Sequence, residues 1–228
     1  MSATRAGRNG SLLGAGLLGA GLYLLCITVG AARLLQVSAK ATPLLCLLVW
    51  LWPSRTRYAR LIRTGLLLSL AGDLLLDAAP HLFLPGLGAF LLAHVAYGAA
   101  YLTVTRAPSL SRGLPFAFLA GGASTFLGPR LGGLALPVVA YVVVICAMMW
   151  RAAAMGGEAG LARREQGFAL AGSVLFAASD GLLALRLFVL PLPGASYPIM
   201  LLYWTGQLCI ALSAGGGRGR DQESLTGR

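Results

Sequence analysis

The chain has 228 residues, of which 57% are hydrophobic and only 11% are charged. A soluble domain carries roughly 25% charged residues, so this composition excludes an ordinary soluble protein, and the mean hydropathy of +0.78 indicates a membrane protein with several spans. The formal net charge of +11 would suit a nucleic-acid-binding protein, but the positions of the basic residues explain it differently.

Apolar runs near the ~20 residues that a bilayer crossing needs recur along the chain. They predict an all-α fold, a polytopic transmembrane helix bundle of about eight spans, within one membrane domain of residues 11–214. Residues 1–10 are predicted to be a cytosolic tail without a cleavable signal peptide, because the apolar run that follows is too long for one. Residues 215–228 are predicted to be a disordered cytosolic tail. The predicted spans are residues 11–32, 34–52, 60–78, 82–104, 113–128, 131–150, 167–190 and 196–214.

The basic residues are unevenly divided between the two sides of this predicted bundle. With eight spans, fourteen of the 18 Lys and Arg residues fall in the tails or on one side of the membrane, and the four others are Arg33, Lys40, Arg130 and Arg186. Cytosolic loops carry an excess of Lys and Arg, so this distribution predicts cytosolic termini. It also accounts for the net charge without nucleic acid, and it predicts a weak attraction to anionic lipid headgroups.

The cysteines lie in apolar runs and form no CxxC motif. The pattern is typical of small buried apolar residues and favours neither a disulfide framework nor a metal site. The four residues are Cys26, Cys46, Cys146 and Cys209.

Several ionisable or polar residues lie within the predicted spans. A charged side chain at the bilayer centre costs roughly 2.5–3.5 kcal/mol on insertion scales, so such residues face the bundle interior and are functional candidates. On the predicted topology they lie between the midplane and the non-cytosolic face, which predicts one polar pocket open toward that face. They are Lys40, Asp73, Asp77, His94, Asp180, Tyr203 and Gln207, with Tyr97 on the same helical stripe as His94.

Structural explanations stay open for each of these residues. Asp73 and Asp180 could pair with Lys40 or Arg186 and hold helices together, and Asp77 could be a solvated rim residue. His94, Tyr203 and Gln207 could be ordinary interhelical hydrogen-bonding groups. Lys40 could extend its amine to the interface.

Known intramembrane chemistries can be compared with this set. A tri-histidine zinc hydrolase needs three His ligands, and the chain has two His residues. In an intramembrane aspartyl protease a GxGD motif is needed, but Leu70 stands at its first glycine and Ser179 precedes Asp180. No GxSxG motif of a serine hydrolase is present.

Four segments in order resemble the YhhN-like lysoplasmalogenase family: "SLAGDLLL" (69–76), "FLPGLGAFLLAHVAY" (83–97), "FAASDGLLALRLF" (176–188) and "YWTGQ" (203–207). Lys40 followed by Pro43 also fits the family's second span. The resemblance implies an eight-span hydrolase of the endoplasmic reticulum or another endomembrane. It implies cleavage of the vinyl ether bond of lysoplasmalogens to a fatty aldehyde and glycerophosphocholine or glycerophosphoethanolamine.

This chemistry agrees with the residues present. Vinyl ether hydrolysis begins with protonation of the alkenyl carbon, which a desolvated carboxylic acid can perform, and a second carboxylate can stabilise the cation and orient water. We therefore expect Asp73, Asp180 and His94 to be catalytic, without metal or cofactor. We expect Lys40, Tyr97, Tyr203 and Gln207 to bind substrate.

A non-enzymatic alternative uses the same pocket. The chain could be a transporter or receptor for a membrane lipid or small molecule, although no inverted repeat with broken helices is evident. The partners expected are the lysoplasmalogen substrate and the membrane, and a homo-oligomer is left open.

Overall fold

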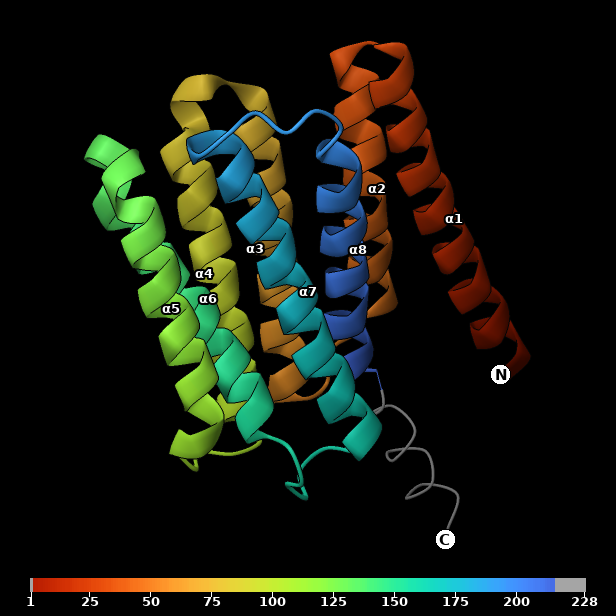
Figure 1. The fold of residues 1–228 in the computed structure, drawn as a ribbon. Helices are drawn as coiled ribbons and strands as arrows, with labels where there is room; N and C mark the ends of the chain where they lie inside the picture. The colour runs from red at the N-terminus through yellow and green to blue at the C-terminus, as the bar shows by residue number, and fades with distance from the viewer. Residues whose placement is uncertain (1, 216–228) are drawn as a thin grey trace, which may run out of the picture.

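The structure is a computed structural model that describes residues 2–215, with side chains from Gly7 onward. The predicted C-terminal tail therefore lies outside the described residues, except for Gly215. Eight α-helices run along the described chain, and Figure 1 shows that consecutive helices are antiparallel. Their bounds are α1 Ser2–Val29, α2 Arg33–Trp50, α3 Arg57–Ala78, α4 Phe83–Leu102, α5 Leu110–Leu131, α6 Ala135–Ala154, α7 Arg163–Phe188 and α8 Ser196–Ser213, with 3-10 turns at Pro80–Leu82 and Gly132–Leu134.

Each of the eight predicted runs coincides with one helix, so the predicted all-α bundle is confirmed. Two boundaries differ from the prediction. Helix α1 begins at Ser2, inside the segment predicted to be a tail, and α5 extends beyond residues 113–128 at both ends. Pro115 and Pro129 lie within α5, in its second and its last turn, so each removes one backbone hydrogen bond from the helix.

Four helical segments are long and apolar enough, by length and composition, to cross a membrane. They contain α1, α4, α5 with α6, and α7, and they are Gly7–Val29, Pro80–Leu102, Leu110–Ala154 and Arg163–Phe188. The helices that fall short are α2, α3 and α8. Lys40 lies on α2, Asp73 on α3 and Gln207 on α8. These polar residues of the interior contribute to the lower mean hydropathy of the three helices.

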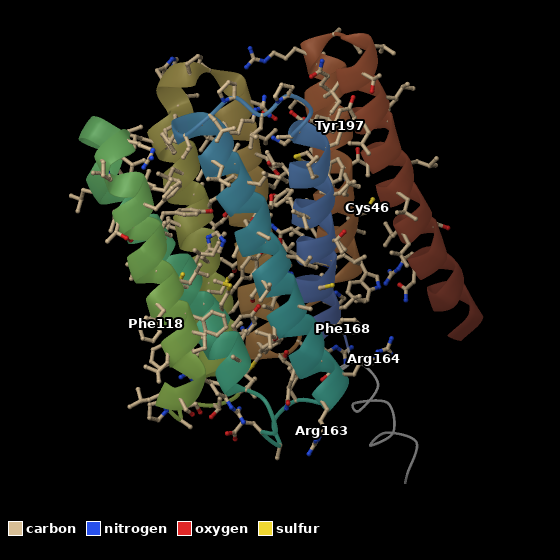
Figure 2. All side chains as sticks on the ribbon, in the orientation of Figure 1. Cys46, Phe118, Arg163, Arg164, Phe168 and Tyr197 are labelled. Carbon is tan, nitrogen blue, oxygen red and sulfur yellow. The ribbon has the colours of Figure 1, made fainter. Side chains whose placement is uncertain are left out.

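The outer surface of the bundle is apolar, as a lipid-facing surface should be. Leu17, Phe118 and Leu136 are 71%, 78% and 81% exposed, and Figure 2 shows Phe118 on the outer side of α5. By contrast, Lys40 and Asp73 are buried inside. This arrangement is that of a polytopic helical membrane bundle.

The helices pack as close pairs whose contacts depend on glycine. A Cβ at Gly172 of α7 would lie 2.7 Å from the carbonyl oxygen of Gly206 in α8, and a Cβ at Gly206 would lie 2.9 Å from the nitrogen of Phe176. In α3, a Cβ at Gly72 would lie 2.6 Å from the Phe90 ring of α4. Small residues let helix backbones approach closely in membranes, so these glycines fix the positions of α7 against α8 and of α3 against α4.

Tyrosine hydroxyls connect helices through the part of the core that lies nearer the connections after α2, α4 and α6. Tyr58 of α3 bonds Ser213 of α8 at 2.8 Å, and Tyr101 of α4 bonds Ser173 of α7 at 3.0 Å. Each is an interhelical hydrogen bond in a low-dielectric interior, which stabilises one arrangement of the helices.

The two ends of the bundle differ in charge. Figure 2 shows Arg163 and Arg164 at one end and Tyr197 at the other. The connections after α2, α4 and α6 lie at the end with Arg163, because the helices alternate in direction. This is the end to which the basic loop residues of the sequence belong.

Candidate active site

The first polar cluster, which we call the Lys40 cluster, joins α2, α3 and α8. Lys40 Nζ lies 3.1 Å from Asp73 Oδ1 and 2.9 Å from Asp77 Oδ2. The hydroxyl of Tyr203 donates a hydrogen bond of 2.6 Å to the other oxygen of Asp73. Asp73 and Asp77 are one helical turn apart on the same face of α3, so a single ammonium reaches both.

Burial decides between the roles open to Lys40. Its side chain is 10% exposed and that of Asp73 is 7% exposed, whereas Asp77 is 31% exposed. The amine therefore does not extend to the interface, and that alternative is wrong. Asp77 is partly solvated, as a rim residue would be, but it is ion-paired with Lys40, and Arg33 donates a hydrogen bond to its backbone carbonyl.

The second polar cluster, which we call the Asp180 cluster, joins α4, α6 and α7. The hydroxyl of Tyr141 donates a hydrogen bond of 2.5 Å to Asp180 Oδ2, and His94 Nε2 lies 3.9 Å from the same oxygen. Neither ring nitrogen of the buried His94 makes a hydrogen bond of standard geometry with a described residue. The backbone of Phe90, four residues earlier, makes a weaker hydrogen-bonding contact with the ring. His94 is thus poised beside Asp180 without forming a hydrogen bond to it.

The charge environments of Asp73 and Asp180 differ. Lys40 compensates the charge of Asp73 at 3.1 Å. Among the residues with described side chains, no Lys or Arg lies within 4.0 Å of the Asp180 carboxyl. An uncompensated charge at bilayer depth is costly, and a negative charge is compensated by a nearby cation at Asp73 but not at Asp180.

Aromatic rings connect the two clusters. The ring of Phe176 is edge-on to His94 at 4.6 Å and to Tyr203 at 5.2 Å between centroids. It therefore contacts one residue beside each carboxyl group. Asp73 is hydrogen-bonded to Tyr203, and Asp180 lies beside His94.

Tyr97 and Gln207 lie next to the Lys40 cluster. Tyr97 donates a hydrogen bond of 2.7 Å to Gln207 Oε1, and its oxygen lies 3.4 Å from Ser69 Oγ. Gln207 also interacts with Tyr203, while its Nε2 has no hydrogen-bond partner in the described part of the chain. The pair connects α4 to α8 behind the tyrosine that holds Asp73.

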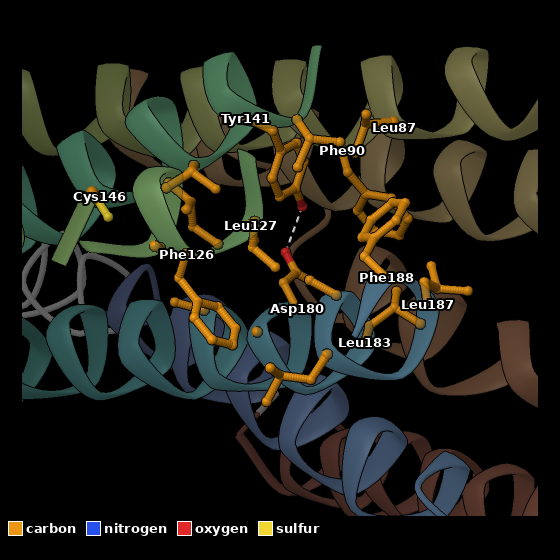
Figure 3. Close-up of a pocket in the computed structure, with 18 of the residues that line it drawn as sticks. Leu87, Phe90, Phe126, Leu127, Tyr141, Cys146, Asp180, Leu183, Leu187 and Phe188 are labelled. Carbon is orange, nitrogen blue, oxygen red and sulfur yellow. Dashed lines mark hydrogen bonds between the residues drawn. The ribbon is translucent and has the colours of Figure 1, made fainter. Parts of the chain in front are cut away.

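A pocket of about 290 Å³ opens beside the Asp180 cluster, between α4, α5, α6 and α7 (Figure 3). Asp180 is the only carboxylate among the described residues that line it, and Figure 3 shows its hydrogen bond to Tyr141 at the wall. The remainder of the lining is almost wholly Leu, Phe, Val, Ile and Ala. Neither Asp73 nor Lys40 lines this pocket.

The residues predicted from the sequence thus fall into two neighbouring groups. The structure brings Lys40, Asp73 and Tyr203 together, and separately His94 and Asp180. The sequence does not predict a role for Tyr141, although a tyrosine inside an apolar run was a signal for it. Among residues 7–215, no group of three or more His, Cys, Asp or Glu side chains is placed to hold a metal ion.

The chain is similar in sequence to several proteins that share one name. The chain is 39% identical over 180 residues to lysoplasmalogenase TMEM86B of Homo sapiens, covering 77% of this chain and 73% of that protein. It is 34% identical to the Mus musculus lysoplasmalogenase TMEM86B, over 84% of this chain and 80% of that protein. A lysoplasmalogenase of Mycobacterium bovis is 35% identical over 68% of this chain and 60% of its own length.

No solved structure matches the chain. Residues 35–214 match the sequence profile of the YhhN family. This range includes every residue of both polar clusters. The chain therefore belongs to the YhhN family.

Proposed function

We propose that the chain is a lysoplasmalogenase that hydrolyses the vinyl ether bond of 1-alkenyl lysoglycerophospholipids with a choline or ethanolamine headgroup. The products are a fatty aldehyde and glycerophosphocholine or glycerophosphoethanolamine. The observation that carries the proposal is the pair of unlike carboxyl groups, Asp180 without a cation and Asp73 beside Lys40. Relatives named lysoplasmalogenase support it.

Asp180 is the proton donor in this proposal. The proton adds to the alkenyl carbon that is β to the ether oxygen, and an oxocarbenium ion forms at the adjacent carbon. Water then attacks this carbon and loses a proton, and the resulting hemiacetal collapses to aldehyde and alcohol. Asp180 faces the apolar pocket, so a neutral acid is presented where an alkenyl chain would lie.

Asp73 acts as the second carboxylate. A negative carboxylate near a developing oxocarbenium ion stabilises it, as the paired carboxylates of glycosidases do. Tyr203 and Lys40 hold the two oxygens of Asp73 in place. His94 has an unpaired ring nitrogen beside Asp180; it receives the proton that the attacking water releases and passes it to Asp180, which restores the acid.

The proposed role of Lys40 differs from that of a phosphate ligand. Its ammonium is fully engaged by Asp73 and Asp77 inside the bundle, so it acts as their counter-ion. Tyr97 and Gln207 position Tyr203 and, through it, Asp73. The chemistry needs a proton donor and water, and no cofactor enters it.

We infer an endomembrane location, in the endoplasmic reticulum or a related organelle, with both termini in the cytosol. The excess of basic residues at one end of the bundle supports this orientation. The substrate's headgroup would then lie toward the opposite face.

The test is aldehyde release by purified protein in detergent, from a lysoplasmalogen and from its saturated 1-alkyl analogue, with and without a chelator. We expect aldehyde from the vinyl ether alone, unchanged by the chelator. Asp180→Asn should lower kcat by about 100-fold or more while leaving the elution volume and unfolding temperature of the protein unchanged. Full activity in a folded Asp180→Asn variant would refute the assigned acid, and no aldehyde from the folded wild type would refute the function.

A further inference from the structure

The pocket beside Asp180 has the shape and chemistry of a site for a hydrocarbon chain. Its volume of about 290 Å³ is lined by apolar side chains from five helices, and the polar groups at its wall are Asp180 and Tyr141 (Figure 3). An apolar cavity of this kind gains free energy by binding methylene groups rather than water. Its occupant must therefore be an apolar chain that has its reactive or polar group at one point.

The pocket extends from the Asp180 cluster in both directions along the bundle, toward the basic end and toward the connection between α7 and α8. Along α6 its lining runs from Tyr141 through Cys146 to Met149, and Tyr141 and Met149 are about 12 Å apart at 1.5 Å per residue. Leu119 of α5 also lines the part of the pocket toward the basic end. With the headgroup toward the opposite face, as proposed above, a chain whose first carbons meet Asp180 would have its remaining methylenes along this stretch.

Toward the opposite end the pocket is lined by Phe83 of α4 and by Leu187 and Phe188 of α7. Leu127, Leu131 and Val138 form a separate apolar cluster against Ala184 and Phe188, where α5 meets α7. Nearer its middle the pocket reaches the outer surface between these two helices, because Phe126 of α5 and Gly181 of α7 line it and are exposed. An apolar chain can therefore enter from the side, between α5 and α7.

We propose that this pocket binds the alkenyl chain of the substrate and selects its length, with the distal methylenes between Leu119, Cys146 and Met149. The inference rests on the proposed function, because it places the vinyl ether at Asp180. It assigns chain-length preference to residues of α5 and α6 that lie beyond the Asp180 cluster. The occupant is a single-chain lysophospholipid, not a sterol or a diacyl lipid.

The first experiment narrows the part of the pocket toward the basic end. Cys146→Phe adds a ring where the distal methylenes lie, and Val143→Phe is the matched control on the same helix, since Val143 is 52% exposed and faces outward. Each methylene excluded from the pocket costs roughly fourfold in binding. We expect the ratio of kcat/KM for octadecenyl over decenyl lysoplasmalogen to fall by about tenfold or more in Cys146→Phe and to stay within about twofold in Val143→Phe.

The second experiment does not depend on turnover or on the folding of a variant. A saturated 1-alkyl lysophosphocholine with a diazirine at its chain end is photolysed with wild-type protein, and the labelled peptides are identified by mass spectrometry. We expect label in the peptides of α5 and α6 that contain Leu119 and Met149, removed by unlabelled lysolipid. Label confined to outer residues such as Leu17 and Leu136, or removed by a sterol and not by lysolipid, would overturn the proposal.

The two proposals can fail separately. Label at Leu119 and Met149 without any aldehyde release would keep the chain-binding site and refute the vinyl ether hydrolase. Aldehyde release with an unchanged chain-length ratio in a folded Cys146→Phe variant, and with label outside the pocket, would keep the hydrolase and refute the site.

Discussion

Tyr141 donates a hydrogen bond to Asp180, so it is a protein group through which the proposed acid can be tuned. In Tyr141→Phe the carboxyl group keeps its place in the wall of the pocket and loses this donor. The lost hydrogen bond would have stabilised the carboxylate that forms as Asp180 gives up its proton, and hydrogen bonds to charged groups contribute about 1.5–3 kcal/mol. We therefore expect kcat to fall by about tenfold or more, with little change in KM. Steady-state kinetics of aldehyde release measure both constants.

Tyr197→Phe is the matched control for this change. Tyr197 lies in the first turn of α8, is exposed, and shares a hydrogen bond of 2.8 Å with Thr28. Its substitution removes the same hydroxyl from a tyrosine that is hydrogen-bonded to neither cluster, so kcat should be preserved. Equal losses in the two variants would show that Tyr141 stabilises the fold and does not act on Asp180.

Lys40 is the only lysine of the chain, and every other basic residue is an arginine. A compact ammonium can lie between two carboxylates one helical turn apart, where a planar guanidinium prefers to bind one of them with two hydrogen bonds. We expect Lys40→Met to lower the free energy of unfolding by about 3–5 kcal/mol, because it leaves Asp73 without a counter-charge in the interior. Adding Asp77→Asn to that variant should recover part of the loss.

Thermal unfolding in detergent micelles measures both Lys40 variants. If Lys40→Met unfolds at the wild-type temperature, the ammonium is not a needed counter-ion. A double variant that is less stable than the single one would show that Asp77 contributes to stability by itself.

At the level of single residues, the sequence predicted which polar groups lie within the spans and offered Lys40 as a partner of Asp73, which the structure shows at 3.1 Å, but it did not predict the partners of Asp77 and Asp180. The i, i+4 spacing placed Asp73 and Asp77 on one face of a helix, yet Asp77 was expected at the rim without a specific partner. Its pairing with Lys40 depends on the packing of α2 against α3, which no local pattern encodes. Tyr141 was missed for the same reason, because its partner lies on another helix.

The contact between α7 and α8 is the element on which the relation of the two clusters depends. Asp180 lies on α7 and Tyr203 on α8, and the helices meet backbone to backbone at Gly172 and Gly206. A methyl group at Gly206 would lie 3.0 Å from the carbonyl oxygen of Gly172, so neither backbone can accommodate it without moving. We expect Gly206→Ala to separate the helices, lower the unfolding temperature and reduce kcat.

Gly167→Ala provides the control on the same helix pair. Nothing lies within 4 Å of a Cβ at Gly167, and alanine is about 0.8–1.0 kcal/mol more favourable than glycine inside a helix. This variant should be as stable as the wild type or more stable. Should Gly206→Ala behave like Gly167→Ala in thermal unfolding and in activity, the close approach is not required.

Helices were predicted well because each needs only a run of apolar residues, and eight runs gave eight helices. Their ends were predicted less well. Helix α5 was expected only over residues 113–128, a short run rich in glycine, but packing against α6 keeps Leu110–Leu131 helical. Tertiary contacts thus override local propensity at such positions.

The whole molecule has a chemical polarity along its axis, and this polarity predicts its orientation. The connection between α6 and α7 lies at the arginine-rich end, and the connection between α7 and α8 lies at the other (Figures 1 and 2). Ala159 and Pro193 are exposed in these two connections. In sealed microsomes, we expect Ala159→Cys to react with a membrane-impermeant maleimide from outside, and Pro193→Cys to react only after the membrane is permeabilised.

The native cysteines provide the background, since Cys26 and Cys146 are buried and Cys46 and Cys209 are partly buried. Wild-type protein should therefore react little in both conditions. The reverse order of labelling would invert the proposed topology and place the termini outside the cytosol.

The opening of the pocket between α5 and α7 also determines which concentration the protein responds to. A site that is filled from within the bilayer equilibrates with the mole fraction of its ligand among the surrounding lipids, not with the amount per volume of water. Turnover should then decrease when inert phospholipid dilutes the substrate in the membrane at constant total substrate. It should be unaffected by added buffer, because the aqueous phase is only where the headgroup product leaves.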